Sequence, residues 1–265
     1  MTTILDEIVE KKRADLIIKK NILSAKHLEE KVINKLKINR SKISFCEAIN
    51  NSENTNIIAE IKRVSPSKGP LRPDLDPINL AMSYEQSGAC AVSVLTEEHF
   101  FKGSDHDLQE VNKKLRIPLL RKDFTIDEYQ IWEAKLIGAD AILLIASILS
   151  EEELVKFSTL AKSLELDILL EVHNEAELEK ALVAKPQILG VNNRNLKTFE
   201  VNLQTSFNLI SKYKTCNTAA WVSESGIYER EQIDDLSTAG FKAFLIGESL
   251  LKHKNPAEKL KELVG

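Results

Sequence analysis

The chain has 265 residues, with 36 Lys and Arg against 40 Asp and Glu, which gives a formal net charge of −4. Its composition is 43% hydrophobic and 29% charged, which excludes an intrinsically disordered or fibrous chain. Mild acidity gives no support for nonspecific nucleic-acid binding. The longest apolar run, Ala141–Leu149, is well short of the roughly 20 residues that a membrane helix needs. We therefore expect neither nucleic acid nor a membrane as a partner.

The cysteines and the N-terminus indicate the compartment. Cys46, Cys90 and Cys216 lie far apart and form no metal-binding or disulfide pattern, so we interpret them as free thiols in a reducing environment. The N-terminal apolar stretch contains Asp6 and Glu7 and lacks a signal-peptide cleavage pattern. These features predict a cytoplasmic protein.

Residues 1–50 have a helical pattern throughout. Apolar residues recur at helical spacing from Ile4 to Val9, and Ser44 with Glu47 forms a capping-box pattern. An amphipathic stretch of this kind must pack its apolar side on another part of the chain. We expect residues 1–50 to be a helical extension packed on a catalytic barrel formed by residues 51–265, in one structural domain.

From Asn56 onward, short apolar runs alternate with amphipathic helices, predicted over 77–88, 127–138, 151–165 and 175–183 among others. Continuous apolar strands followed by helices are typical of a parallel sheet that is buried on both faces. Eight such units favour a closed (β/α)8 TIM barrel. The alternative, an open doubly wound sheet, is disfavoured because the first strand runs into IKRVSPSKGP rather than a glycine-rich nucleotide loop. The predicted strands are Ile57–Ile61, Ala91–Leu95, Pro118–Leu120, Ala141–Ile145, Ile168–Leu170, Ile188–Val191, Ala219–Val222 and Ala243–Ile246.

Charged and polar side chains occur where a barrel interior should be apolar. Side chains alternate along a strand, and the carboxyl ends of barrel strands are where such enzymes carry their chemistry. A buried structural ion pair would explain one charged strand end but not several. Mixed charges at this density keep a lysine protonated beside a carboxylate, so that it can donate a proton. The residues concerned are Glu60, Lys62, Lys122, Glu171, Asn192 and Arg194.

The last two predicted strands end in glycine-containing turns, Ser223–Gly226 and Gly247–Ser249. In barrel enzymes these two loops form the usual phosphate site. Each turn is a weak signal alone, because glycine in such a loop is often only a turn residue. Both turns together, opposite Lys62, predict phosphate binding.

Seven motifs resemble those of the indole-3-glycerol phosphate synthase family and occur in the same order. The likeness covers about residues 56–250, and the family has a helical N-terminal extension of similar length. The motifs are AEIKRVSPSKG (59–69), SVLTEEHFFKGS (93–104), LLRKDFTIDEYQI (119–131), LLEVHN (169–174), LGVNNRNL (189–196), SESGI (223–227) and FLIGESL (244–250).

The resemblance implies a carboxy-lyase of tryptophan biosynthesis. Its substrate is 1-(2-carboxyphenylamino)-1-deoxy-D-ribulose 5-phosphate, and its products are indole-3-glycerol phosphate, carbon dioxide and water. No metal and no organic cofactor take part in the family's reaction. The small-molecule substrate is the expected partner, and we expect a monomer or a weak homo-oligomer.

The resemblance also implies catalytic roles. Lys122 matches the general acid, and Glu171 matches the general base. Glu60 is similar to the carboxylate that orients the lysines. Lys62 resembles the lysine shared between the carboxylate and phosphate ends of the substrate, and Asn192 lies beside the reacting hydroxyl.

Further residues resemble the family's substrate contacts. Ser65 and Arg194 match contacts to the anthranilate carboxylate, and Phe101 and Phe124 match the walls of the aryl site. Glu248 departs from relatives that have Ser or Thr, and we expect its backbone N–H to face the phosphate while its side chain points away. The phosphate loops match Ser225, Gly226, Gly247 and Glu248, with Glu224 in the same region.

Other features have simpler interpretations. The five histidines show no metal-ligand spacing, and we expect His173 to be a solvated loop residue. The segment Ser65–Gly69 is predicted to be a mobile lid over the substrate. Trp132 and Trp221 are expected to be packing residues.

Two rival functions stay open at this point. An Amadori-type sugar isomerase would need an acid–base pair, often Cys and Asp, at the first and fifth strands, where this chain has Glu60 and Glu171 instead. A barrel that binds a phosphorylated aromatic compound without turnover is the non-enzymatic alternative.

Overall fold

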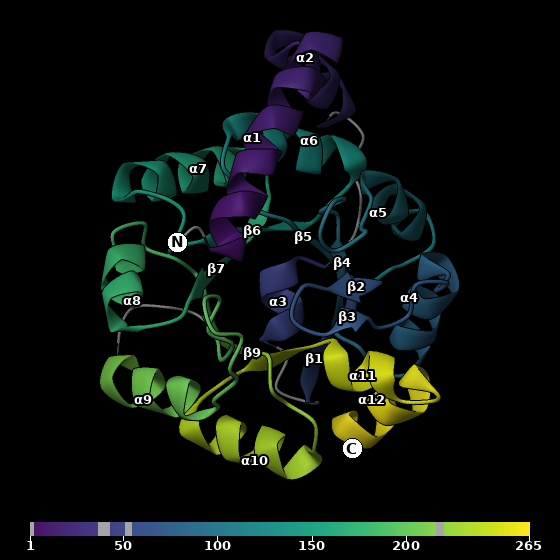
Figure 1. The fold of residues 1–265 in the computed structure, drawn as a ribbon, viewed down its shortest axis with the longest axis vertical. Coiled ribbons are helices and arrows are strands. Elements are labelled where there is room, and N and C mark those ends of the chain that lie inside the picture. The colour runs from purple at the N-terminus through teal and green to yellow at the C-terminus, as the bar shows by residue number, and fades with distance from the viewer. Residues whose placement is uncertain (1–2, 37–42, 51–54, 216–219) are drawn as a thin grey trace.

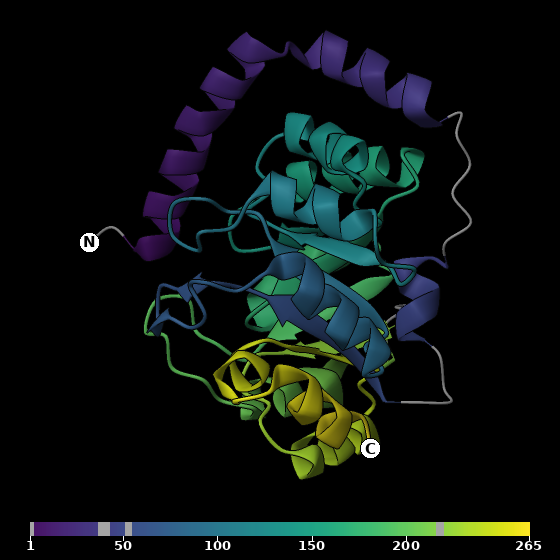
Figure 2. The same ribbon diagram turned by 90° about the vertical axis from the view of Figure 1, so that its right-hand side faces the viewer.

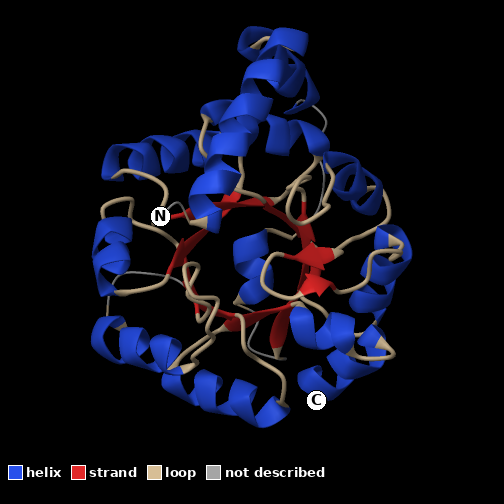
Figure 3. Ribbon diagram, viewed as in Figure 1, coloured by secondary structure: helices blue, strands red, loops and turns tan. Residues whose placement is uncertain are grey.

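The computed structural model describes residues 3–36, 43–50, 55–215 and 220–265. Its barrel strands are β1 (Asn56–Ile61), β4 (Ala91–Leu95), β5 (Leu119–Lys122), β6 (Ala141–Ile145), β7 (Asp167–Val172), β8 (Ile188–Asn192), β9 (Ala220–Glu224) and β10 (Ala243–Ile246). They are all parallel and close into a barrel (Figure 3). Their order around the barrel is β1-β10-β9-β8-β7-β6-β5-β4. The predicted (β/α)8 TIM barrel is confirmed.

Helices form the outer layer of the barrel (Figure 1). Two of the predicted starts are confirmed: Asp76 caps its helix through the N–H groups of Ile78 and Asn79, and Ser150 forms a capping box with Glu153. No helix in the described parts of the chain combines the length and the apolar character needed to cross a membrane. The outer helices are α4 (Pro77–Gln86), α5 (Asp105–Asn112), α6 (Glu128–Ile137), α7 (Glu151–Ser163), α8 (Glu175–Leu182), α9 (Gln204–Tyr213), α10 (Arg230–Ala239), α11 (Glu248–Lys252) and α12 (Pro256–Val264).

The predicted apolar runs lie in the barrel strands apart from two end residues: Pro118 precedes β5, and Ala219 is outside the described residues. Several strands continue past their apolar run. In β5, Lys122 pairs in register with Leu95, and in β9 Glu224 pairs with Asn192. These polar residues are therefore held by the sheet ladder rather than by a loop, which fixes their backbone positions.

The interior of the barrel is apolar below the strand ends. Ile58 lies in the inner cluster with the inward residues of the other strands, while Ile57 and Ala59 pack with the outer helices. The alternation predicted for β1 is thus confirmed. The short helix α3 (Phe45–Ile49), begun by the predicted capping box at Ser44, inserts into the inner cluster and closes the amino-terminal end of the barrel.

The N-terminal segment forms two further helices, α1 (Ile4–Ile22) and α2 (Ala25–Leu36), which arch along one side of the barrel (Figure 2). The predicted helical character of residues 1–50 is confirmed for most of its described part, with breaks at 23–24 and 43–44; residues 1–2 and 37–42 lie outside the described residues. Cys46 and Cys90 are free thiols, and Cys216 also lies outside the described residues.

The loop after β1 contains a short hairpin that the sequence did not predict. Strands β2 (Val64–Ser65) and β3 (Gly69–Pro70) pair in antiparallel register. Gly69 has a positive φ of 70°, a conformation that glycine adopts without strain. The mobility of this predicted lid stays a prediction.

Candidate active site

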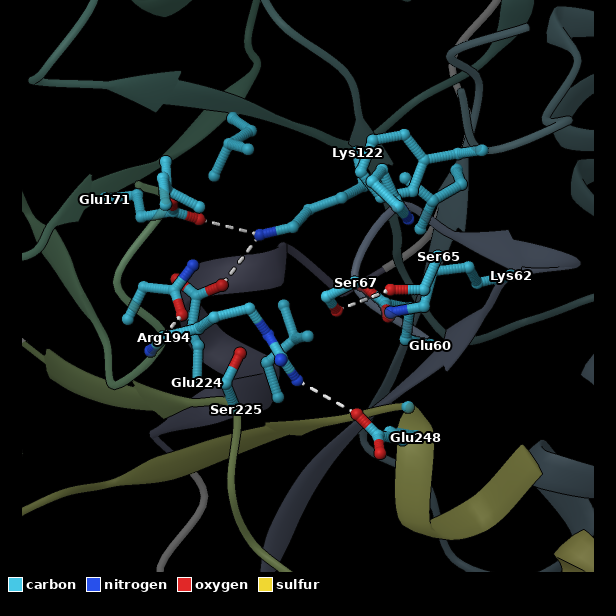
Figure 4. Close-up of a pocket in the computed structure, with 18 of the residues that line it drawn as sticks. Glu60, Lys62, Ser65, Ser67, Lys122, Glu171, Arg194, Glu224, Ser225 and Glu248 are labelled. Atoms are coloured by element: carbon cyan, nitrogen blue, oxygen red, sulfur yellow. Dashed lines mark hydrogen bonds and ion pairs between the residues drawn. The ribbon is translucent and has the colours of Figure 1, made fainter. Parts of the chain in front are cut away.

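Every predicted site residue lines one pocket at the carboxyl ends of the barrel strands (Figure 4). The barrel brings together side chains from five strands and the loops that follow them. The predicted catalytic residues in this pocket are Glu60, Lys62, Lys122, Glu171 and Asn192. The predicted substrate contacts in it are Ser65, Phe101, Phe124, Arg194, Glu224, Ser225, Gly226, Gly247 and Glu248.

Lys122 lies at the centre of the charged floor. Its Nζ donates hydrogen bonds to Oε2 of Glu171 at 2.9 Å and to Oε2 of Glu224 at 2.7 Å. Burial alone would lower the pKa of Lys122, but the two carboxylates outweigh burial and raise the pKa above its usual range. The amine is therefore held as an ammonium ion, which is the form that can donate a proton.

Glu171 and Glu224 share Lys122 but differ in their surroundings. Burial disfavours the charged form of both. At Glu171, attraction to Lys122 and His173 outweighs burial and holds the pKa well below its usual range. At Glu224, burial dominates and repulsion from Glu171 adds to it, so the pKa is raised. Two neighbouring carboxyls with separated pKa values are typical of an acid–base site.

Two glycines make room for two of these carboxylates. A Cβ on Gly190 of β8 would lie 2.2 Å from Oε1 of Glu224, and a Cβ on Gly247 would lie 2.4 Å from Oε1 of Glu60. Any side chain at either position would displace the carboxylate. The sequence analysis missed Gly190, because it reads as part of an apolar strand.

Glu60 and Lys62 form a second ion pair, across the pocket from Glu171 (Figure 4). Both residues project from the end of β1, two positions apart and therefore on the same face. Glu60 is also close enough to Lys122 to help raise its pKa. The pocket thus presents two lysines, each beside a carboxylate.

Aromatic side chains form one wall. The rings of Phe101 and Phe124 lie 6.0 Å apart between centroids and are tilted by 39°. The carboxylate of Glu97, which is buried, accepts hydrogen bonds from the N–H groups of His99, Phe100 and Phe101. Glu97 therefore fixes the loop that carries Phe101.

Arg194 and Glu248 face each other across the loop after β9. Nη2 of Arg194 donates to Oε2 of Glu248 at 2.9 Å, and Oε1 of Glu248 accepts from Lys252 at 2.6 Å and from Tyr228 at 3.2 Å. The expectation that the Glu248 side chain points away from the site is wrong. Its carboxylate is paired with Arg194, and both residues line the pocket (Figure 4). The role of Glu248 in a phosphate cradle stays a prediction.

The chain turns sharply after β9. Ser225 has φ of 67° and Gly226 has φ of 83°. A Cβ on Gly226 would lie 2.4 Å from Cγ1 of Val201, so both conformation and space require glycine there. Gly247 precedes the first turn of α11, where N–H groups lack partners within the helix.

The N-terminal helix completes the pocket with residues that the sequence analysis did not name as site residues. Ile4, Leu5 and Ile8 of α1 are among the lining residues. Nζ of Lys12 lies 2.8 Å from Oδ1 of Asp123, whose side chain is only 3% exposed. Asp123 directly follows Lys122, so α1 is tied to the strand end that carries the central lysine.

His173 is mostly shielded from solvent, contrary to the expectation of a solvated loop residue. Its side chain is only 10% exposed. Nδ1 lies 2.9 Å from Oε2 of Glu177, and Nε2 lies 3.2 Å from Oε1 of Glu171. The prediction was wrong because the strand continues to Val172 and α8 then folds Glu177 back over the ring.

The fold and the pocket define a (β/α)8-barrel enzyme whose site lies at the carboxyl ends of its strands. Residues 5–263 match the model of a family described as indole-3-glycerol phosphate synthase. A protein of that name from Sulfurimonas denitrificans is 44% identical over 260 residues, covering 98% of each chain. One from Thermoanaerobacter pseudethanolicus is 46% identical over 261 residues, covering 98% of this chain and 97% of the relative. The chain belongs to the indole-3-glycerol phosphate synthase family.

A solved structure supports the fold independently. A mutant of the tryptophan synthase α-subunit from Pyrococcus furiosus matches with a TM-score of 0.61 at 14% identity, covering 79% of this chain and 98% of that one. At this identity the likeness concerns the barrel alone. Within the part of the chain that the structure describes, no three His, Cys, Asp or Glu side chains are grouped to hold a metal ion.

Proposed function

We propose that this chain converts 1-(2-carboxyphenylamino)-1-deoxy-D-ribulose 5-phosphate into indole-3-glycerol phosphate, carbon dioxide and water. The enzyme is a carboxy-lyase of tryptophan biosynthesis, as its family membership over nearly the whole chain implies. The observation that carries the proposal is Lys122, an ammonium ion only 12% exposed and within 3 Å of two carboxylates. Such a group supplies the proton that ring closure requires.

The first task of the site is to fold an extended substrate that is negatively charged at both ends. The turn at Ser225 and Gly226, with the first turn of α11, supplies N–H groups for the phosphate. Lys62 and Ser65 line the same pocket after β1, and they are the groups proposed to bind the anthranilate carboxylate. Anchoring both ends brings the aryl carbon close to the carbonyl carbon, which lowers the entropic part of the barrier.

Arg194 is a second group for the anthranilate carboxylate. Its guanidinium is occupied by Glu248, so the incoming anion has to replace that carboxylate. Glu248 keeps Lys252 and Tyr228 as partners when it releases Arg194. The exchange leaves no charge without a partner.

Ring closure begins when Lys122 protonates the carbonyl oxygen while the aryl carbon attacks the carbonyl carbon. Loss of carbon dioxide returns its bonding electrons to the ring and restores aromaticity. The hydroxyl then leaves as water with a proton from a lysine, while Glu171 removes the proton from the neighbouring carbon. Asn192 lies beside the reacting hydroxyl, and Glu60 holds Lys62 in place.

We further propose that the protein works in the cytoplasm as a monomer or weak homo-oligomer, with a small phosphorylated molecule as its partner. The biosynthetic role of its family supports this location. Nucleic acid and membrane have no part in the proposed reaction, and neither does a metal or an organic cofactor.

A steady-state assay that follows the fluorescence of the indole product tests the proposal. We expect turnover by the purified protein and a loss of at least about 1,000-fold in kcat for Lys122→Ala, with the fold retained. Lys114→Ala removes an exposed lysine outside the pocket and is the matched control, with unchanged kcat. Tight substrate binding without product would favour the binding protein, and a ketose product without carbon dioxide release would favour the isomerase.

A further inference from the structure

His173 follows Glu171 by two residues and comes directly after the end of β7. It is not among the lining residues, whereas Glu171 is. The two side chains are two positions apart along one strand direction and share a face. Nε2 of His173 lies 3.2 Å from Oε1 of Glu171, and Oε2 of Glu171 accepts from Lys122. One oxygen of Glu171 thus faces the imidazole of His173, and the other faces the ammonium group of Lys122.

The charged groups around His173 are few. Glu171 faces Nε2, and Glu177 of α8 faces Nδ1 at 2.9 Å while also accepting the backbone N–H of His173. The flanking strands β6 and β8 contain no titratable side chain. Lys122 and Glu224 lie beyond Glu171, on the pocket side. The imidazole therefore has a carboxylate on each side and no cation next to it within the described residues.

The proposed reaction creates a difficulty for Glu171. The general acid of the reaction, Lys122, and its general base, Glu171, are paired with each other when no substrate is bound. When Lys122 gives its proton to the substrate, the neutral amine no longer stabilises the neighbouring carboxylate. A buried carboxylate without a cation becomes easier to protonate, and it would then lose its function as a base.

We propose that His173 is a positioning residue that keeps Glu171 ionised and oriented towards the substrate while Lys122 is neutral, and that Glu177 keeps His173 protonated for this purpose. This inference rests on the proposed function. His173 touches no reacting atom and acts through Glu171. With this arrangement, Glu171 can stay ionised whether or not Lys122 carries its proton.

The protonation equilibrium of His173 agrees with this geometry. Burial alone would lower the pKa of the imidazole, but contacts with Glu171 and Glu177 outweigh burial and raise the pKa to about 10. His173 is therefore a cation at neutral pH, where an ordinary histidine is mostly uncharged.

Kinetics of three variants across pH test the proposal. We expect His173→Gln to lower kcat roughly tenfold or more and to move the acidic limb of the kcat profile upward by at least about one pH unit, because Glu171 loses a cation. KM should change less than about threefold, since His173 does not line the pocket. Glu177→Gln should move the alkaline limb downward, because His173 then loses its proton more easily.

His106→Gln is the matched control, because His106 is exposed on α5. Its profile should equal that of the wild type. Unchanged limbs in His173→Gln and Glu177→Gln, with only a uniform loss of kcat, would show a merely structural role and overturn the proposal. Absence of turnover in the wild type would instead remove the proposed function, and this inference with it.

A measurement on the wild type covers the case in which His173→Gln does not fold. Nitrogen-15 spectra of labelled histidine should show one of the five imidazoles doubly protonated at about pH 8, well above the ordinary histidine pKa, and Glu177→Gln should change that signal. Five imidazoles that all titrate below this pH would rule out the charged His173.

Discussion

Two of the carboxylates in the pocket can take up their positions only because a neighbouring residue is glycine. Glu224 reaches Lys122 only because Gly190 leaves space beside it, and Glu60 reaches Lys62 beside Gly247. A glycine in a strand is usually destabilising, because it loses more conformational freedom and packs nothing. Here the cost is offset by the room that each carboxylate needs.

Gly190→Ala should therefore disrupt catalysis without touching a charged residue. The added Cβ would lie 2.2 Å from Oε1 of Glu224 and 3.0 Å from Cδ1 of Leu169, so Glu224 has to leave Lys122. We expect kcat to fall at least about tenfold, with a stability loss of about 1–3 kcal/mol from overpacking. Steady-state kinetics and urea unfolding measure the two effects.

A double-mutant cycle identifies the cause. If Gly190→Ala acts by displacing Glu224, its effect on kcat should nearly vanish in a Glu224→Gln background. Fully additive effects in the double variant would mean that the substitution disturbs the barrel in another way.

At the level of single residues, the sequence predicted which side chains reach the pocket but not how they pair. Strand alternation and position at a strand end are local properties, so Lys122 and Glu171 could be predicted. The contact between Lys122 and Glu224 joins residues 102 positions apart, and only the closed barrel brings them together. The burial of His173 depends on Glu177 folding back over it, which no local pattern indicates.

Among the elements, α1 is the one whose attachment matters most for the site. It adds apolar side chains to the pocket wall, and its lysines contact acidic groups on the barrel. Besides Lys12, Lys19 binds Asp105 and Glu133, each at 2.8 Å. The contact of Lys12 with Asp123 is the most buried of these, so it should contribute most to holding the helix.

Lys12→Met should loosen α1. Asp123 would keep Thr96 and Arg121 as partners but lose the cation that most lowers its pKa. We expect a loss of about 2 kcal/mol in the free energy of unfolding and a several-fold rise in KM. Urea unfolding and steady-state kinetics measure these changes.

Lys11→Met is the matched control, one residue away. Lys11 is exposed and lies 3.6 Å from Asp15, so its removal should change stability by no more than about 0.5 kcal/mol. Equal effects of the two substitutions would mean that the contact with Asp123 does not anchor α1.

The elements themselves could largely be predicted, because each barrel strand contains a short, mostly apolar run. Their ends could not. The run in β5 stops at Leu120, but the ladder continues through Arg121 to Lys122, since both retain partners in neighbouring strands. The hairpin of β2 and β3 was missed because each of its strands has only two residues and no apolar alternation.

On the scale of the whole molecule, a net charge of −4 conceals an uneven distribution. Inside the barrel, the lysines and carboxylates of the pocket gather at the carboxyl ends of the strands, whereas α3 and apolar residues fill the other end. Charged groups that are shielded from water stabilise the fold only while they remain paired. The stability of the molecule should therefore depend on pH through the groups of the active site.

His173 gives this dependence a definite sign. Its pKa in the folded protein, about 10, lies above the ordinary value of 6.5. Its contribution to stability is therefore fully present below about pH 6.5 and is lost as the pH rises through about 10. The pKa difference corresponds to at most about 5 kcal/mol, and relaxation of the buried site should reduce this to a few kcal/mol.

Urea unfolding of the wild type and of His173→Gln between about pH 6 and pH 10 measures this contribution. The difference in unfolding free energy between the two proteins should be largest near pH 6 and shrink steadily towards pH 10. If the substitution also changes packing, that part of the free-energy difference does not depend on pH and adds a constant offset. His106→Gln should show no such trend, because its imidazole is exposed. A difference that stays constant across the range would mean that folding does not raise the pKa of His173, so that Lys122 alone would hold Glu171 ionised.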